Sequence, residues 1–72
     1  MTSATTFTVH VNGEAQQWPQ GTTIADLVAS LALIGKRYAV ERNHEIVPRA
    51  EHADTVLQAQ DHVEIVQAIG GG

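Results

Sequence analysis

The sequence predicts an α+β fold in which a mixed sheet packs against one main helix. Three observations carry this prediction: an alternating apolar and polar run around an Asn-Gly turn, one stretch with apolar residues at helical spacing, and several short strand-like runs after it. The chain has 72 residues and forms one small domain. A domain of this size buries only about 60% of its unfolded surface, so the sheet and the helix must share one core.

The first predicted element is a β-hairpin. Residues 7–11 alternate apolar and polar side chains, as in a strand with one buried face. Asn12 and Gly13 follow, and both accept the positive φ angles of a two-residue hairpin turn. The return strand is predicted over residues 14–18 and ends before Pro19.

The helix is predicted to begin after Thr23, which can cap it while Asp26 completes a capping box. Its apolar stripe follows a spacing of three and four residues: Ile24, Leu27, Val28, Leu31 and Ile34. Gly35 is the expected stop signal. Leu33 lies off the stripe.

The rest of the chain is predicted to form short strands separated by turns: residues 38–41, 45–47, 56–57 and 63–69. A single helical turn is expected at residues 50–54. The connection through the helix predicts a parallel strand pair with a right-handed crossover. One helix covers one face of so small a sheet, and the predicted core joins the two: Phe7, Val9, Val11, Val63 and Ile65 against Ile24, Leu27, Val28 and Leu31.

Composition excludes several classes of function. Four Lys and Arg residues against eight Asp and Glu give a net charge of −4, which disfavours nucleic-acid binding and suits a partner with a basic groove. The absence of cysteine excludes a disulfide framework and a thiolate metal site. Residues 1–6 lack signal-peptide features, and the apolar run 25–34 is too short to span a bilayer. We expect a cytoplasmic protein with no membrane partner that is a monomer when free.

The four histidines do not predict a metal site. His10, His44, His52 and His62 follow no compact ligand spacing, and we expect them to be solvated. No Ser-His-Asp spacing indicates a hydrolase, and no glycine-rich phosphate loop is present.

The most informative feature is the glycine run 70–72, directly after the last predicted strand. Glycine has no Cβ, so such a tail can enter a narrow slot, and the terminal glycyl carbonyl is unhindered. These properties suit a carboxylate that another enzyme activates, although a glycine-rich end can also be incidental. We therefore expect a flexible extension over residues 1–6, a domain over 7–69 and a flexible tail over 70–72.

From Phe7 onward the chain resembles the ThiS family, the sulfur carriers of thiazole formation in thiamine biosynthesis. The matching segments are Asn12-Gly13, residues 19–27, 39–43, 45–49 (Glu-Ile-Val-Pro-Arg), 63–66 (Val-Glu-Ile-Val) and the terminal glycines. The resemblance implies a β-grasp, ubiquitin-like fold. His44 and Gln60 stand where the family usually has glycine, and the extension 1–6 is longer than the family needs.

The resemblance also implies a reaction cycle. A ThiF-type adenylating enzyme uses ATP and Mg²⁺ to convert the Gly72 carboxylate into a glycyl-adenylate. A cysteine desulfurase or a rhodanese-like donor supplies sulfur, and the resulting thiocarboxylate passes it to the thiazole synthase ThiG. The chain is then a protein co-substrate with no bound cofactor, not an enzyme. Because the chain has no cysteine, the carried sulfur can sit only at the C-terminus.

Partner contacts are expected at Val66 and Ala68, on the sheet face away from the helix, and at Ile69, which precedes the tail residues Gly70 and Gly71. Arg42 and Arg49 are expected to be solvated, with pairing to acidic groups as the alternative. Three alternatives stay open: the small subunit of molybdopterin synthase, a ubiquitin-like protein modifier, and a β-grasp binding module whose glycines are incidental.

Overall fold

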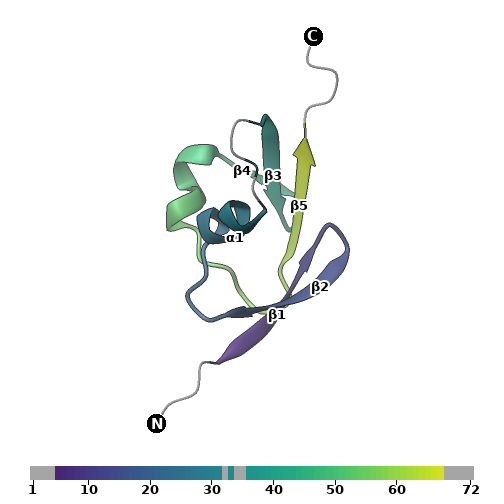
Figure 1. The fold of residues 1–72 in the computed structure, drawn as a ribbon, viewed down its shortest axis with the longest axis vertical. Helices are drawn as coiled ribbons and strands as arrows, with labels where there is room; N and C mark the ends of the chain where they lie inside the picture. The colour runs from purple at the N-terminus through teal and green to yellow at the C-terminus, as the bar shows by residue number, and fades with distance from the viewer. Residues whose placement is uncertain (1–4, 32, 34–35, 68–72) are drawn as a thin grey trace.

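The computed structural model describes residues 5–31, 33 and 36–67, and these form one five-stranded mixed sheet with its helices on one face (Figure 1). The elements in chain order are β1 (Thr6–Val11), β2 (Glu14–Pro19), α1 (Ile24–Ser30), β3 (Tyr38–Arg42), β4 (Glu45–Val47), the 3₁₀ helix η1 (Arg49–Asp54) and β5 (His62–Gln67). The strand order is β2-β1-β5-β3-β4, so the last strand is the central one. A sheet of this order wrapped around one main helix is the predicted β-grasp fold.

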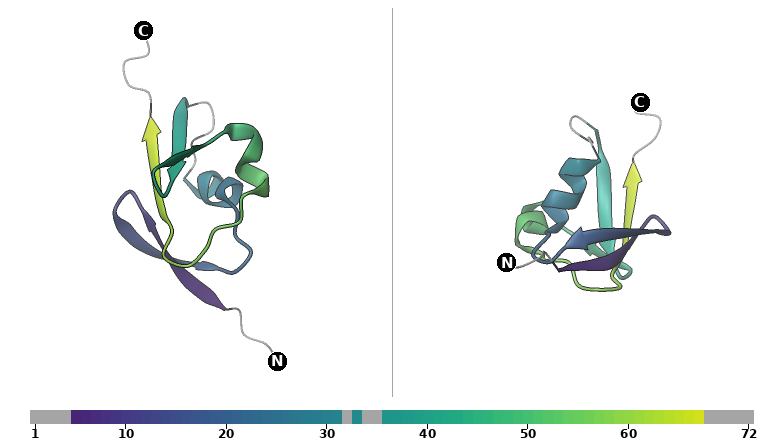
Figure 2. Two further views of the ribbon diagram at one scale, coloured as in Figure 1. Left: turned by 180° about the vertical axis from the view of Figure 1, so that it is seen from behind. Right: turned by 60° about the horizontal axis from the view of Figure 1, so that its bottom comes forward.

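The central strand provides the predicted parallel pairing. β5 runs parallel to β1, with His10 opposite His62 and Val11 opposite Val63, and antiparallel to β3. Figure 2 shows α1 packed across the concave side of the sheet while the opposite side stays uncovered. In the part of the chain that the structure describes, no helix is long and apolar enough to cross a membrane.

Both hairpins of the sheet have two-residue turns. Asn12 and Gly13 have φ angles of 51° and 84° between the β1 and β2 strands, which confirms the first predicted hairpin. Asn43 and His44 have φ angles of 52° and 72° between β3 and β4. β2 extends one residue further than predicted, to Pro19, because an edge strand does not need the missing N–H of proline.

The start of α1 agrees with the prediction, and its end does not. Asp26 N donates to Thr23 Oγ1 at 3.1 Å and Thr23 N donates to Asp26 Oδ2 at 3.0 Å, which completes the capping box. The helix was expected to continue to Ile34 but ends at Ser30. Leu31 N bonds to Val28 O at 3.0 Å, a tighter turn than that of an α-helix. Ile34 and Gly35, the rest of the expected stripe and its stop signal, lie outside the described residues.

Because α1 ends early, two leucines differ in burial from the prediction. Leu31 was assigned to the core but is 36% exposed, so that assignment is wrong. Leu33, which did not fit the stripe, is buried. Once the backbone leaves the helix after Ser30, the helical period no longer decides which side chain faces the sheet.

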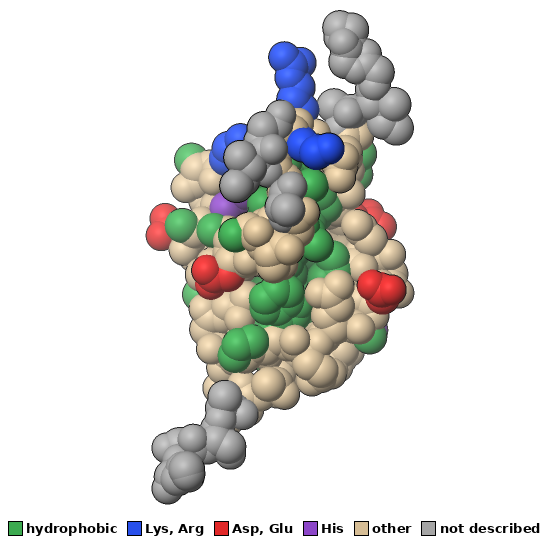
Figure 3. All heavy atoms as spheres, in the orientation of Figure 1, with side chains coloured by type: hydrophobic (Ala, Val, Ile, Leu, Met, Phe, Trp, Pro, Cys, Tyr) green, Lys and Arg blue, Asp and Glu red, His purple; other side chains and the backbone are tan. Residues whose placement is uncertain are grey.

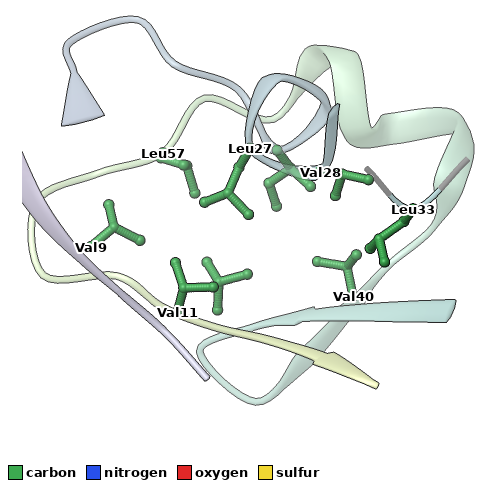
Figure 4. Packing of buried hydrophobic residues seen from close by; sticks show 9 residues of the cluster. Val9, Val11, Leu27, Val28, Leu33, Val40 and Leu57 are labelled. Atoms are coloured by element: carbon green, nitrogen blue, oxygen red, sulfur yellow. The ribbon is translucent and has the colours of Figure 1, made fainter. Parts of the chain in front are cut away.

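The core lies between α1 and the sheet (Figure 4). Six predicted members are buried: Val9, Val11, Ile24, Leu27, Val28 and Val63. Phe7 and Ile65 are partly buried against this cluster. Val40 of β3 and Leu57 of the segment before β5 join this cluster, although neither is among the predicted core residues.

The chain between β4 and β5 closes the helix side of the core. The expected helical turn is present as η1 and begins one residue earlier, at Arg49. Residues 56–57 form no full strand but make an isolated bridge between Thr23 and Val56. Leu57 N also donates to Thr22 O at 2.9 Å, so this segment holds the start of α1.

Candidate functional site

The candidate site is built around β5, the strand that leads to the C-terminal glycines. Its last described residue is Gln67, which lies opposite Tyr38 of β3. The predicted site residues Gly70, Gly71 and Gly72, and the predicted contacts Ala68 and Ile69, lie outside the described residues. The described structure therefore defines the base of the tail and the surfaces around it.

The two hairpin turns fix β5 through asparagine side chains. Asn43 Oδ1 accepts a hydrogen bond from His62 N at 2.9 Å, and Asn12 Oδ1 accepts one from Ile65 N at 2.8 Å. Both asparagines have the positive φ that their turns require. The side chain of each one also bonds to the backbone of the central strand. The parallel pairing of β1 with β5 has only two residue pairs and ends at Val63. The Asn12 side chain adds a bond two residues further along β5, at Ile65.

Asp61 anchors the loop immediately before β5. Its side chain is buried and accepts hydrogen bonds from Arg42 Nε at 2.7 Å, Asn43 Nδ2 at 3.0 Å and Gln58 N at 2.8 Å. Arg42, expected to be solvated, is therefore an ion-pair partner. This network ties the β3–β4 hairpin to the chain that enters β5.

The charge state of Asp61 follows from these contacts. Burial by itself would raise the pKa of the carboxyl group, because it removes water from the charged form. The hydrogen bonds from Arg42, Gln58 and Asn43, together with the positive charge of Arg42, outweigh that effect and lower the pKa below its ordinary value. Asp61 is therefore ionised at neutral pH.

The face of the sheet away from α1 carries an exposed apolar patch. Val66 is 56% exposed and lies directly opposite the exposed Ala39, while Ile46 of β4 is 65% exposed on the same face. We call Ala39, Ile46 and Val66 the open-face patch. Val66 was expected here, at the base of the tail. Ile46 was missed, because only the register of the β3–β4 hairpin places it beside the other two.

Two carboxylates border the open-face patch. Glu41 lies opposite Glu64 in the β3–β5 pair and opposite Ile46 in the β3–β4 pair. Like charges directly opposite one another on a sheet are unfavourable for stability. An acidic pair beside exposed apolar side chains fits a partner surface that combines basic and apolar groups.

Comparison with known proteins identifies the family. A model of the ThiS family matches residues 6–72. The chain belongs to the ThiS family.

Individual relatives agree with this assignment. The ThiS-family chain is 40% identical to the sulfur carrier protein ThiS of Bacillus subtilis over 65 residues, covering 89% of this chain and 98% of that protein. It is 41% identical over 64 residues to the thiazole synthase of Magnetococcus marinus, covering 89% of this chain but 20% of that protein. The chain thus spans about a fifth of the length of that relative. The crystal structure of the thiamine biosynthesis protein ThiS from Geobacter metallireducens superposes with a TM-score of 0.72 at 26% identity, covering 92% of this chain and all of that one.

The histidines of this ThiS-family chain have separate structural roles. His52 was expected to be solvated but is buried, and its Nε2 donates to Val47 O at 3.0 Å. His10 and His62 stack with their ring centroids 4.6 Å apart, and His10 also bonds to Gln60. Among the described residues, no three potential ligands are placed to hold a metal ion.

Proposed function

We propose that this ThiS-family chain is a sulfur carrier that holds sulfur as a thiocarboxylate on Gly72 for the formation of a thiazole ring. The observation that carries the proposal is the family match, which runs from residue 6 to the terminal glycine. The similarity to Bacillus subtilis ThiS supports it, because the alignment covers nearly the whole of that carrier.

The proposed chemistry first activates the Gly72 carboxylate and then exchanges one of its oxygen atoms for sulfur. An oxygen of the Gly72 carboxylate attacks the α-phosphorus of ATP, pyrophosphate leaves, and a glycyl-adenylate forms. A sulfide equivalent then attacks the glycyl carbonyl carbon and AMP leaves, so the terminal carboxylate becomes a thiocarboxylate. If the sulfur arrives as a persulfide, the resulting acyl disulfide is cleaved by a second thiol, which is oxidised to a disulfide with the donor.

The chain contributes the reacting carboxylate, while its partners contribute the catalytic groups. A carboxylate is a poor electrophile until one oxygen becomes a good leaving group, and adenylation by a ThiF-type enzyme supplies that change. Mg²⁺ and cationic side chains at the phosphates belong to that enzyme. The absence of cysteine restricts the carried sulfur to the C-terminus.

The match to a thiazole synthase supports the choice of acceptor. In Magnetococcus marinus, a segment similar to this chain makes up a fifth of a protein named thiazole synthase. A carrier joined to a synthase in one polypeptide implies that the two act together. We therefore propose a ThiG-type synthase as the acceptor of sulfur, in preference to the large subunit of molybdopterin synthase.

The open-face patch is the proposed docking surface for these partners. It lies on the uncovered side of the sheet and includes Val66, next to the base of the tail. A partner that covers the patch would bury exposed apolar surface as it encloses the tail. The fixed β5 strand would then present the tail in a defined direction.

Intact-protein mass spectrometry tests the function. The chain is incubated with ATP, Mg²⁺, a ThiF-type enzyme and a sulfur donor. We expect a mass gain equal to replacing one oxygen by one sulfur, and no gain for a chain that lacks Gly71 and Gly72. The shortened chain serves as a control because the core side chains lie between Val9 and Val63, so its melting temperature should be unchanged.

The second stage of the test addresses the acceptor. Purified thiazole synthase is added to the thiocarboxylated chain, and the return of the original mass is followed together with thiazole product. If the intact chain forms neither adenylate nor thiocarboxylate, the carrier function is wrong. If it forms the thiocarboxylate but gives no thiazole product, the thiazole assignment is wrong.

A further inference from the structure

A second surface lies on the helix side of the sheet, away from the open-face patch. A groove of about 480 Å³ runs between α1 and η1. Its hollow shape results from small side chains on the two helices, because Ala25 and Ala29 of α1 face Ala53 of η1. We call this hollow the helix groove.

The rim of the helix groove is basic. Lys36 and Arg49 line it, and none of its nine described lining residues is acidic, although the chain has eight acidic residues and four basic ones. Arg49 is held in place, since its guanidinium carbon lies 4.7 Å from the centre of the Tyr38 ring. By contrast, Arg42 on β3 is neutralised by the buried Asp61.

The helix groove lies at the same end of the molecule as the base of the tail. Tyr38 lines the groove and is also the residue opposite Gln67, the last described residue of β5. Figure 3 shows the Lys and Arg side chains gathered at the upper end of the molecule, with the Asp and Glu side chains of that view lower down. A protein that encloses the tail therefore comes within reach of the groove.

We propose that the helix groove binds an acidic segment of the ThiF-type adenylating enzyme, the first partner to receive the tail. One apolar side chain of the segment fills the hollow between the alanines, and carboxylates beside it pair with Lys36 and Arg49. The proposal rests on the proposed function, because it assigns the groove to the tail-receiving partner. The charge on the rim is what selects an acidic segment over a basic one.

The two surfaces would hold the carrier from both sides of the sheet. Ala39 belongs to the open-face patch, while its neighbour Tyr38 lines the helix groove, because successive residues of a strand face opposite sides. A partner that contacts both sides would grip the β3–β5 pair at the base of the tail. The acidic open face and the basic groove would also fix the orientation of docking, since a reversed carrier would meet like charges.

The test measures association of the ThiF-type enzyme with the carrier by stopped-flow at low and high salt. The variant is Lys36→Gln with Arg49→Gln, which lowers the net charge by two. The control, Gln20→Glu with Ala59→Glu, lowers it equally at exposed sites outside the helix groove. Arg49→Lys retains the charge. Melting temperatures confirm that each variant is folded.

We expect the groove variant to associate about 10-fold more slowly at low salt, and the difference to shrink as salt screens the charges. The control variant should change the rate less than twofold, and Arg49→Lys should stay close to the wild type. A third variant, Ala29→Leu, fills the hollow and should weaken binding at every salt concentration.

Two failures are distinguishable. If the wild-type chain forms the thiocarboxylate and the groove and control variants slow association equally, only total charge matters and the groove proposal is overturned. Equal rates for the wild type and the groove variant would overturn it as well. If the wild-type chain is not adenylated at all, the proposed function fails first.

Discussion

At the scale of single residues, Asp61 combines burial with charge. A buried carboxylate stays ionised only where hydrogen bonds and a positive charge replace the water that it has lost. Arg42, Asn43 and the backbone of Gln58 supply them here. The lowered pKa of Asp61 means that folding favours its charged form.

The pH dependence of stability tests this account. Because the pKa of Asp61 is lower in the folded chain, its contribution is fully present above the ordinary value of 3.8 and is lost as the pH falls through the folded value. We expect Asp61→Asn to reduce the free energy of unfolding by about 2 kcal/mol at neutral pH. Urea denaturation from neutral pH to below pH 4 measures both effects. If the wild type and Asp61→Asn lose stability equally as the pH falls, Asp61 is not the source.

A second residue-scale prediction concerns His44. This residue has a φ angle of 72° in a two-residue turn, a conformation that glycine adopts without steric cost. Gly13 occupies the equivalent position in the first hairpin. We expect His44→Gly to raise the free energy of unfolding by about 0.5–1 kcal/mol, measured by thermal or urea denaturation.

The matched control for that substitution is Ala59→Gly. Ala59 is exposed and does not have a positive φ angle, so glycine there should only add freedom to the unfolded chain. The control should be slightly destabilising. A destabilised His44→Gly chain would show that the imidazole contributes more than the strain of its backbone costs.

At the scale of secondary-structure elements, the sheet has one face that packs into the core and one that stays exposed, and we propose the exposed face for partners. Along β5, Val63 is buried while Val66 is exposed, and along β3, Val40 is buried while Ala39 is exposed. Alternation along each strand was predictable from the sequence. The combination of Ala39, Ile46 and Val66 into one patch depends on strand register.

The open-face patch can be tested by Val66→Lys. The residue is 56% exposed, so the free energy of unfolding should change by less than about 0.5 kcal/mol. Binding to the ThiF-type enzyme should weaken about 10-fold or more, because a charge would be buried against an apolar partner surface. Isothermal titration calorimetry measures the affinity. Val56→Lys is the matched control, since Val56 is 45% exposed and lies outside the patch.

That control decides between a specific patch and a general effect of charge. If Val56→Lys weakens binding as much as Val66→Lys does, the added positive charge is responsible and the open face is not the docking surface. Ile46→Lys extends the test to the neighbouring strand β4, where the same loss of affinity is expected.

At the scale of the whole molecule, the distribution of charge matters more than its sum. The net charge of −4 predicts a partner with a basic groove, and Glu41 and Glu64 beside the open-face patch agree with that expectation. The net charge does not reveal the basic rim of the helix groove, which Lys36 and Arg49 form on the other side of the sheet. Under our proposal, a carrier with two differently charged sides would dock in one orientation, which would direct the tail into its partner.

The sequence by itself determined the local features of this protein and the family to which it belongs. The Asn12-Gly13 turn and the Thr23 capping box are set by residues close together in the chain, so their pattern was readable without a structure. The segments that resemble ThiS, together with the glycine run at the C-terminus, gave the family and the proposed thiocarboxylate. Both depend on residue type and order alone.

Only the tertiary structure decided which residues far apart in sequence come together. It ended α1 at Ser30, buried Leu33 in place of Leu31, and placed Asp61 among partners from β3 and the β3–β4 turn. It also buried His52 against β4. Each outcome depends on packing and hydrogen bonding between residues far apart in the chain, and patterns within a short stretch of sequence do not specify which of these contacts form.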